Sequence, residues 1–471
     1  MFHIRCIESE FILFPYLILS PRCAGDGFER RWSGRYIIVR MSESPLQEAS
    51  SPPFTSPVET GAPTQWRLSA RSTFAALRYP NYRLWFIGQL VSLVGTWMQS
   101  TAQGYLIFEL TKSPAYLGYV GFVAGIPAWL FTLYGGVVAD RISRRTLLVI
   151  TQTSMMVLAF GLGALAFAGL VKPWHILVFA FLLGIANAFD APARQSFVLE
   201  MVPREVLINA IALNSTMFNA ATAVGPAAGG LLYAAVGPAW CFTINGASFV
   251  AVIAALLMMK LMPVVSNQRK SSILADVKAG FNYVHNNLVP RTVIAQLAVL
   301  SVFGISFVAL MPAWAVEVLG GDAATNGFLQ SARGVGALIG ALMIAAIGGY
   351  VAGGKLVSLG SFVFPLTLLA FAATRWLPLS LLTLIGIGWG FMVFANSSNA
   401  LLQSQVPDEL RGRVMSMYTL AFFGLMPIGS LLAGEAASWI GEQLTVAIGA
   451  LILLAASGLV WLIVPQLRRG D

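Results

Sequence analysis

Charged side chains are scarce in this sequence. Only 10% of the 471 residues are Asp, Glu, Lys or Arg, whereas soluble domains average roughly 25%. This scarcity excludes a soluble globular protein. Hydrophobic residues make up 57% of the chain, and apolar runs of about twenty residues recur, each long enough to cross a hydrocarbon core of about 30 Å. Because these runs do not alternate polar and apolar residues, they predict membrane-spanning helices rather than barrel strands.

Cysteine and histidine are also rare, with three of each in the chain. The cysteines form no framework of paired bridges, and the scattered histidines do not make a histidine-rich metal site. The segment 349–356, GYVAGGKL, nearly matches a phosphate-binding loop, but Leu356 lacks the hydroxyl that holds Mg²⁺. We therefore expect no metal, no cofactor and no ATPase or other enzyme activity.

The net charge of +9 does not indicate nucleic-acid binding, because the arginines lie in short loops between apolar runs. One set of connections is rich in basic residues and defines the arginine-rich end: 140–145, the Arg204 loop, 263–290, Lys355, 411–413 and 468–469. The alternate connections define the arginine-poor end: 111–114, 171–175, 236–240, 317–327, 375–378 and 439–443. The positive-inside rule predicts that the arginine-rich end and both termini are cytoplasmic.

The apolar runs predict an all-α membrane protein with twelve transmembrane helices in two pseudo-symmetric six-helix bundles. The expected spans are 82–108, 115–139, 146–169, 175–198, 206–235, 239–262, 291–316, 326–350, 355–375, 378–403, 413–438 and 443–464. A shift of 204 residues places Gly184, Gly225, Gly230 and Gly237 on Gly388, Gly429, Gly434 and Gly441. Because glycines fix close helix approach, this match predicts two bundles, 74–262 and 291–465, joined by a cytoplasmic connector, 263–290, and followed by a tail, 466–471.

Residues 1–73 differ from the rest. The apolar stretch 12–19 is too short to span a membrane, and the segment after Met41 is rich in Ser, Pro, Glu and Thr, a composition typical of disorder. We expect a disordered cytoplasmic extension, and we interpret residues 1–40 as an over-extended gene start with Met41 as the first natural residue.

Four motifs carry a family resemblance. Residues 136–145, GVVADRISRR, resemble the loop between helices 2 and 3 of the major facilitator superfamily, with Ser143 at a usual glycine position. Residues 225–230, GPAAGG, are similar to the end of the helix-5 signature of proton-driven efflux members. The stretches 189–203 and 406–418 resemble the subgroup of enterobactin exporters and macrolide efflux proteins. The resemblance covers about residues 74–465 and implies an alternating-access carrier.

The resemblance implies a cytoplasmic gate around Asp140, whose charged groups hold the two halves together when the carrier opens outward. Asp140 is expected to face the start of helix 11 near Arg413, and Arg144 is within expected reach of Asp190 on helix 4. An ionised carboxylate facing lipid is costly, so it needs such a partner; a purely topological role for the arginines is the alternative. The predicted gate residues are Gly136, Asp140, Arg141, Arg144, Arg145, Asp190, Arg194, Arg411 and Arg413.

Polar residues at helical spacing predict the substrate path. Five of them fall on one face of helix 1, because their spacing alternates between three and four residues. Interhelical hydrogen bonding is the alternative role. Helices 4 and 10 add further amides and an aromatic ring, which suits an amphipathic organic molecule. The predicted path residues are Gln89, Ser92, Thr96, Gln99, Gln103, Asn187, Trp389, Asn396, Asn399 and Gln403.

Ionisable residues inside the spans predict proton coupling. Arg333 and Glu435 lie at similar depth from their outer helix ends, so we expect an ion pair between them, with Asp190 as the second candidate proton carrier. Helix 5 is predicted to bend and to approach its neighbour at a hinge formed by Gly225, Pro226, Gly229 and Gly230.

These features together predict a proton-driven secondary transporter that exports an amphipathic small molecule, such as a siderophore or a drug, across the bacterial cytoplasmic membrane as a monomer. Its expected partners are the substrate, protons and the lipid bilayer, with no nucleic acid. An importer or lipid translocator on the same scaffold is one alternative. A membrane sensor that carries no flux is the other.

Overall fold

The computed structural model describes residues 32–33, 36–37, 74–260, 273–347 and 353–465, of which 32–33, 36–37, 132–141, 273–277 and 347 are described by their backbone only. The chain divides into two units, 1–67 and 68–471. In the first unit, β1 (Trp32–Ser33) and β2 (Tyr36–Ile37) pair antiparallel, with Trp32 opposite Ile37. This short pairing lies within the extension that the sequence predicts to be disordered, most of which is outside the described residues.

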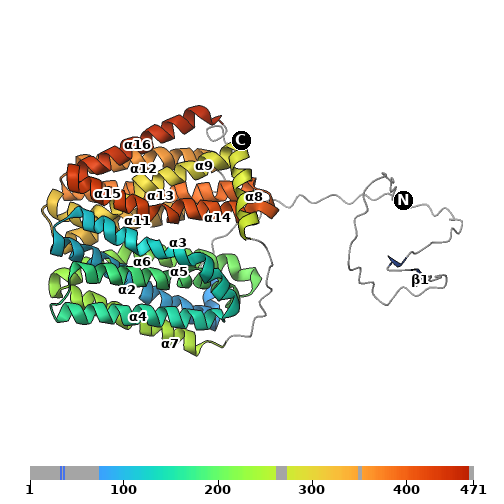
Figure 1. The fold of residues 1–471 in the computed structure, drawn as a ribbon, viewed down its shortest axis with the longest axis horizontal. Helices are drawn as coiled ribbons and strands as arrows, with labels where there is room; N and C mark the ends of the chain where they lie inside the picture. Colours follow the sequence, from blue (N-terminus) through green and yellow to red (C-terminus); the bar gives the residue numbers. More distant parts are fainter. Residues whose placement is uncertain (1–31, 34–35, 38–73, 261–272, 348–352, 466–471) are drawn as a thin grey trace. The chain divides into compact units, whose positions relative to one another are not determined.

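The second unit is helical and contains both six-helix bundles (Figure 1). The first bundle consists of η1 (Ala75–Arg78), α2 (Pro80–Thr111), α3 (Pro114–Arg141), α4 (Arg144–Phe167), α5 (Pro173–Phe197), η2 (Val198–Glu200), η3 (Arg204–Val206), α6 (Leu207–Val236) and α7 (Pro238–Met258). The helix α8 (Ile273–Asn286) occupies the connector, where it packs against α14 (Asp408–Thr419) of the second bundle.

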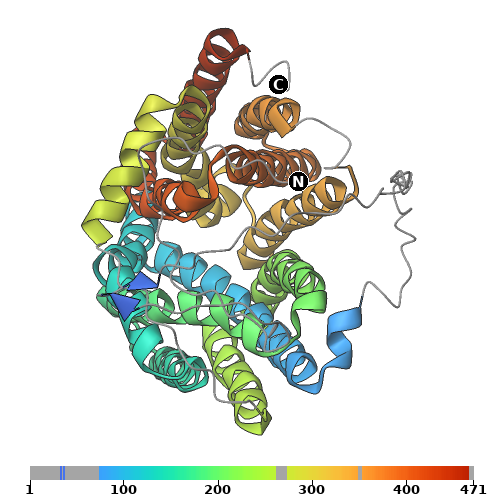
Figure 2. The ribbon, with the colours of Figure 1, turned by 90° about the vertical axis from the view of Figure 1, so that its right-hand side faces the viewer.

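The second bundle consists of α9 (Leu288–Val299), η4 (Leu300–Gly304), η5 (Ile305–Leu310), α10 (Met311–Ala313), η6 (Trp314–Val318), α11 (Ala323–Ile347), α12 (Gly353–Ala373), α13 (Leu377–Gln405), α14 (Asp408–Thr419), η7 (Leu420–Gly424), α15 (Met426–Ile440) and α16 (Glu442–Ile463). Viewed roughly along the helices, the first bundle, blue to green, lies on one side and the second, yellow to red, on the other (Figure 2).

Eleven helical stretches among the described residues are long and apolar enough to cross a membrane. The twelfth expected span is α2, whose 32 residues make a helix of about 48 Å at 1.5 Å per residue. Its mean hydropathy is lowered by the polar face that the sequence places there. The twelve-helix architecture predicted from the sequence is thus confirmed.

The seventh span, expected as a plain helix over 291–316, is irregular. It runs from Leu288 to Val318 and includes two π-helical turns, η4 and η6, and the 3₁₀ segment η5. Gly304 and Pro312 lie within it, and both residue types weaken the regular hydrogen-bond ladder. Because π-helical turns are frequent at functional sites, the space beside this span is a candidate functional site.

Matching glycines end helices in both bundles, as the repeat predicts. Gly237 follows α6 with φ of 86°, and Gly441 follows α15 with φ of 82°. Positive φ is the left-handed region that glycine adopts without steric cost. Ser143, the departure from the usual glycine of the helix 2–3 loop, serves as the N-cap of α4, where its Oγ accepts a hydrogen bond from the Thr146 amide at 3.2 Å.

The two bundles meet where α6 packs on α11 and where α3 packs on α15. Within the second bundle, the core includes Trp314 stacked on Phe371, with ring centroids 4.3 Å apart. The two inter-bundle contacts border the cavity described next.

Candidate functional site: a cavity between the two bundles

A cavity of about 360 Å³ lies between the bundles. Its wall comes mainly from α2, α3, α5 and α7, and the second bundle contributes η5, Pro312 and α11. Polar lining groups are Thr96, Gln99, Ser100, Gln103, Asn187, Asn245 and Gln330, and the rest of the lining is small or apolar. A mostly apolar wall with a few placed polar groups is typical of sites for small organic molecules.

Four of the predicted path residues line this cavity: Thr96, Gln99, Gln103 and Asn187. Gln89 and Ser92, on the same helix, are buried with 1% and 2% of their surface exposed and are outside the lining. The polar face of α2 therefore lines the cavity at one part and packs against protein at another. This arrangement is compatible with both expected roles, lining the substrate path and interhelical hydrogen bonding.

The cavity is also lined by residues that were not predicted from the sequence. Asn245 on α7 donates from Nδ2 to Gln99 Oε1 at 2.7 Å and therefore orients that glutamine. Phe249 lies one turn further along α7 and also lines the cavity, as does Met155 of α4. An amide in an otherwise apolar helix was the available signal for Asn245, because a buried amide needs a partner.

The predicted path residues on α13 are outside the cavity lining. Asn399 Oδ1 accepts from Gln403 Nε2 at 2.5 Å, and Asn396 is exposed. Trp389 is part-buried, and its backbone lies close to Gly340 of α11. In this conformation, the α13 group therefore lies apart from the α2 and α5 groups.

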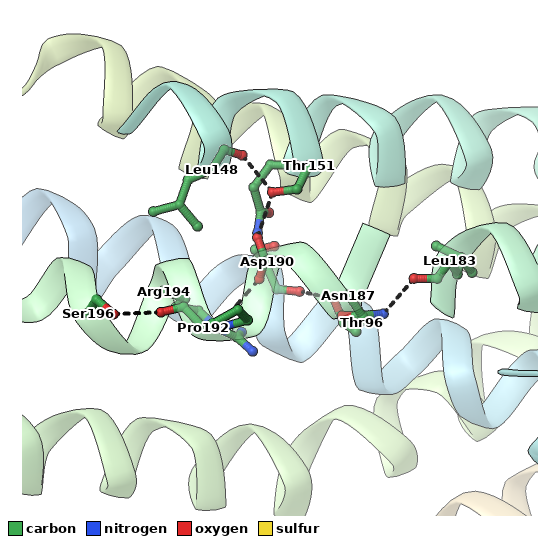
Figure 3. A network of polar contacts seen from close by, with 11 residues as sticks. Thr96, Leu148, Thr151, Leu183, Asn187, Asp190, Pro192, Arg194 and Ser196 are labelled. Carbon is green, nitrogen blue, oxygen red and sulfur yellow. Dashed lines mark hydrogen bonds and ion pairs between the residues drawn. The ribbon is translucent and has the colours of Figure 1, made fainter. Parts of the chain in front are cut away.

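Asp190 of the predicted gate is buried, with 1% of its surface exposed. Its Oδ1 accepts from Thr151 Oγ1 at 2.9 Å and from Gln152 Nε2 at 2.8 Å, both on α4. Its Oδ2 lies 3.6 Å from Arg194 Nε, one helical turn further along α5. Figure 3 shows Asp190 between Thr151 and Arg194. These donors offset the cost of burying the carboxylate.

The expected contact between Arg144 and Asp190 is wrong for this structure. Arg144 Nη1 instead lies 2.9 Å from Glu200 Oε1, and it donates to the Ser196 carbonyl at 3.3 Å. Asp190 lies six residues before Ser196 along α5, and its carboxylate already accepts hydrogen bonds from two side chains of α4. Arg144 lies at the expected end of the bundle, but Glu200 is closer to that end than Asp190 is.

Arg145 and Arg411 of the predicted gate also bond within their own bundle. Arg145 donates to the Leu257 carbonyl at 2.7 Å, and Arg411 lies 2.5 Å from Asp408 and donates to the Gln403 carbonyl at 3.0 Å. Each recorded ion pair among the described side chains therefore joins residues of one bundle. The residues Gly136, Asp140 and Arg141 form the end of α3, but their side chains lie outside the described part of the chain. The backbone of Arg413 lies against Gly280 of α8.

At the arginine-poor end, by contrast, hydrogen bonds join the two bundles. The Tyr119 hydroxyl of α3 donates to Glu435 of α15. Thr101 Oγ1 of α2 donates to Gln330 Oε1 of α11 at 3.5 Å, and the Ala227 amide of α6 donates to Ser331 Oγ at 2.8 Å. These bonds join the two bundles in the half of the spans nearer the arginine-poor end.

Two glycine pairs bring the backbones together at the same end. A Cβ on Gly434 would lie 2.7 Å from Gly118 Cα, and a Cβ on Gly327 would lie 3.0 Å from Gly230 Cα. The repeat relates these contacts, since Gly230 and Gly434 are 204 residues apart and Gly118 and Gly327 are 209 apart. These two backbone contacts between the bundles are therefore related by the repeat.

The predicted hinge of helix 5 lies in this region of α6. Gly225 and Gly229 lie against α2, and Gly230 lies against α11. Pro226 is buried, and the amide that follows it donates to Ser331 Oγ of α11. A proline disturbs the helical ladder of its own turn, and the second bundle supplies an acceptor at this point of α6. The close approach is found, whereas a hinge motion stays a prediction.

The expected ion pair between Arg333 and Glu435 is also wrong for this structure. Glu435 accepts from Tyr119, and none of the ion pairs among the described residues includes Arg333. Arg333 Nε is covered and lacks a hydrogen-bond partner. Similar depth in two helices does not make two side chains face each other, because the rotation of each helix decides that.

The sequence and the fold agree with those of known proteins. The family model described as "Transmembrane secretion effector" matches residues 71–471, and the chain belongs to this family of the major facilitator superfamily. It is 24% identical to the staphyloferrin A transporter of Staphylococcus aureus over 363 residues, covering 76% of this chain and 90% of that protein. It is 26% identical to the enterobactin exporter EntS of Escherichia coli over 406 residues, covering 83% and 93%.

Solved structures confirm the fold. A bacterial homologue of the human lysosomal transporter Spinster, in an inward-facing and unoccupied conformation, matches with a TM-score of 0.63 and 14% identity, over 86% of this chain and 99% of that one. The nucleoside transporter NupG matches with a TM-score of 0.64 and 15% identity, over 81% and 98%. The chain is therefore a multi-pass membrane transporter of the major facilitator fold.

Proposed function

We propose that this protein exports an amphipathic small molecule, of siderophore or drug-like type, across the bacterial cytoplasmic membrane by alternating access. The observation that carries the proposal is the cavity between the bundles, together with the hydrogen bonds and backbone contacts that join the bundles toward the arginine-poor end. With the arginine-rich end on the cytoplasmic side, such a cavity takes its substrate from the cytoplasm. The names of the two relatives, a siderophore transporter and a siderophore exporter, support the substrate class.

The cavity wall is suited to such a molecule. Amides at Gln99, Gln103 and Asn187 offer donors and acceptors, while Phe249 and Met155 offer apolar contact. Binding of a molecule with both kinds of surface excludes water from the apolar wall and satisfies the amides.

The gate proposed around Asp140 closes the arginine-rich end when the other end opens. In the present conformation, Arg144, Arg194 and Arg411 bond within their own bundles, which is the arrangement expected when this gate is released. Reversal of the bundles would bring α3 and α14 together and would let Asp140 approach the start of α14.

Proton antiport is proposed to use Glu435 and Asp190. Glu435 bonds across the bundle interface to Tyr119, so a change in its protonation would alter how strongly that end is held closed. Asp190 holds Arg194 near the arginine-rich end, so its protonation would release a gate arginine. A carboxylate at each end, each engaged in a contact that depends on charge, is what opposite movement of proton and substrate requires.

The test uses inside-out vesicles from cells that produce the protein, with enterobactin as the first probe and an acidic lumen that supplies the proton gradient. We expect accumulation in the lumen that a protonophore abolishes, and no accumulation with Asp140→Asn. Uptake in right-side-out vesicles, with none in inside-out vesicles, would instead support the importer. A panel of amphipathic drugs that also gives no transport in either orientation would contradict carrier function.

A further inference from the structure

The two bundles place Arg333 at a position whose counterpart in the first bundle faces the cavity. Ala124 of α3 lines the cavity, and a Cβ on Gly184 of α5 would lie 2.4 Å from its carbonyl oxygen. Arg333 of α11 makes the same contact with α13, where a Cβ on Gly388 would lie 2.0 Å from its carbonyl oxygen. The offsets are those of the repeat, 209 residues for Ala124 and Arg333 and 204 for Gly184 and Gly388.

The cavity wall includes a close neighbour of Arg333 on α11, whereas Arg333 itself is outside the lining. Gln330, one turn before Arg333 on α11, lines the cavity, and its own counterpart Gly121 lines it as well. Along α11, Arg333 lies nearer the arginine-rich end than Gln330 does. The proposed substrate enters from that end. The equivalent contacts place Arg333 on the second-bundle side of the cavity, one turn beyond the lining residue Gln330.

A cation at this depth needs a partner. Arg333 lies ten residues into α11, about 15 Å from its start at 1.5 Å per residue. An intramembrane arginine is costly unless it meets an anion, a carbonyl or water. Among the described residues, its Nε has no hydrogen-bond partner, and the carboxylate expected for it, Glu435, is bonded to Tyr119.

We propose that Arg333 binds an anionic oxygen group of the substrate, such as a carboxylate, on the second-bundle side of the central cavity. The planar guanidinium presents paired N–H groups that match the two oxygens of a carboxylate. The inference rests on the proposed carrier function and narrows its substrate class to amphipathic acids. The apolar residues and amides of the first bundle then hold the remainder of the molecule.

Binding to purified protein in nanodiscs tests the inference without any need for transport. The probes are amphipathic aryl carboxylic acids, each paired with its methyl ester, which keeps the shape and removes the charge. We expect the wild type to bind acids more tightly than esters. In Arg333→Gln, acids should bind about ten- to a hundredfold more weakly, because a charge-assisted bond is lost, while ester binding stays unchanged.

Two further variants separate recognition from folding. Arg333→Lys keeps the charge and should retain part of the preference for acids, with weaker binding because the fork geometry is lost. Arg375→Gln removes an exposed arginine that bonds Gln443 at the arginine-poor end, and should leave the preference intact. A wild type with no preference for acids, or a preference that survives in Arg333→Gln, would overturn the inference. A preserved preference in a protein that moves nothing in vesicles would refute the export proposal alone.

Discussion

Replacing Gly434 with alanine should open the arginine-poor end. The added methyl group would lie 2.7 Å from Gly118 Cα, 2.8 Å from its amide nitrogen and 2.9 Å from the Pro114 carbonyl oxygen. All three neighbours are backbone atoms, so no side chain can rotate away to relieve the overlap. The helices α3 and α15 must separate instead.

The structure sets the size of the effect. Ordinary carbon contacts begin at 3.4 Å, so the two backbones must move apart by about 0.7 Å at this point. Overpacking of this kind typically costs about 1–3 kcal/mol. Because the contact exists only while the arginine-poor end is closed, the cost falls on that state and should lower its population relative to the opposite state by a factor of roughly 5 to 150.

Distances between spin labels measure this population. Labels at Ser113 and Trp439, on the two sides of the α3–α15 contact, are introduced in a background with Cys6, Cys23 and Cys241 replaced by serine. We expect a narrow, short distance distribution in the parent protein and a longer component in Gly434→Ala.

Gly458→Ala is the matched control, since a Cβ there meets nothing within 4 Å on the helix α16. It should leave the distribution unchanged. An unchanged distribution in Gly434→Ala, with protein that remains folded and monodisperse, would refute the reasoning that the backbone contact holds this end closed.

Three further predictions follow from the charged and hydrogen-bonded groups. Asp140→Asn should abolish transport while membrane insertion, measured by surface labelling and yield, stays normal; full transport by this variant would remove the proposed gate. Tyr119→Phe removes the donor to Glu435, a bond worth about 1–3 kcal/mol, and should raise the open fraction in the same spin-label experiment roughly 5- to 150-fold; a distribution like that of the parent would show that the bond does not hold the arginine-poor end closed. Asp190→Asn should leave Arg194 without its buried counter-charge and make vesicle transport insensitive to a protonophore, whereas normal coupling would assign the proton to another group.

Much of the fold follows from the sequence, because a lipid environment permits few structures. Long apolar runs have to be helices there, and the distribution of arginines predicts which helix ends lie on the same side of the membrane. The repeat of glycines was equally informative, since Gly237 and Gly441 both have positive φ, and Gly230 and Gly434 both lie at backbone contacts between bundles. The irregular course of the seventh span was not predictable, because Gly304 and Pro312 permit π and 3₁₀ turns without dictating them.

The sequence predicted which residue types form the site better than it predicted which of them pair with one another. Spacing along α2 identified the face that carries Thr96, Gln99 and Gln103, since helical periodicity fixes a face without knowledge of the neighbours. The expected partners of Arg144 and Arg333 were wrong, because partners depend on the rotation and tilt of separate helices. Tyr119, Thr151 and Gln152 were missed as partners of carboxylates for the same reason.

The contacts between Gly118 and Gly434, and between Gly230 and Gly327, consist of main-chain atoms. Unlike the Tyr119–Glu435 bond at the same end, these main-chain contacts do not vary with the ionisation or rotamer of any side chain, so their resistance to leakage is independent of what the carrier recognises. Substitutions along the cavity wall can therefore change the range of transported molecules while the membrane stays sealed against water and ions. Substrate range and tightness are separate properties in this protein, and selection can alter the first without loss of the second.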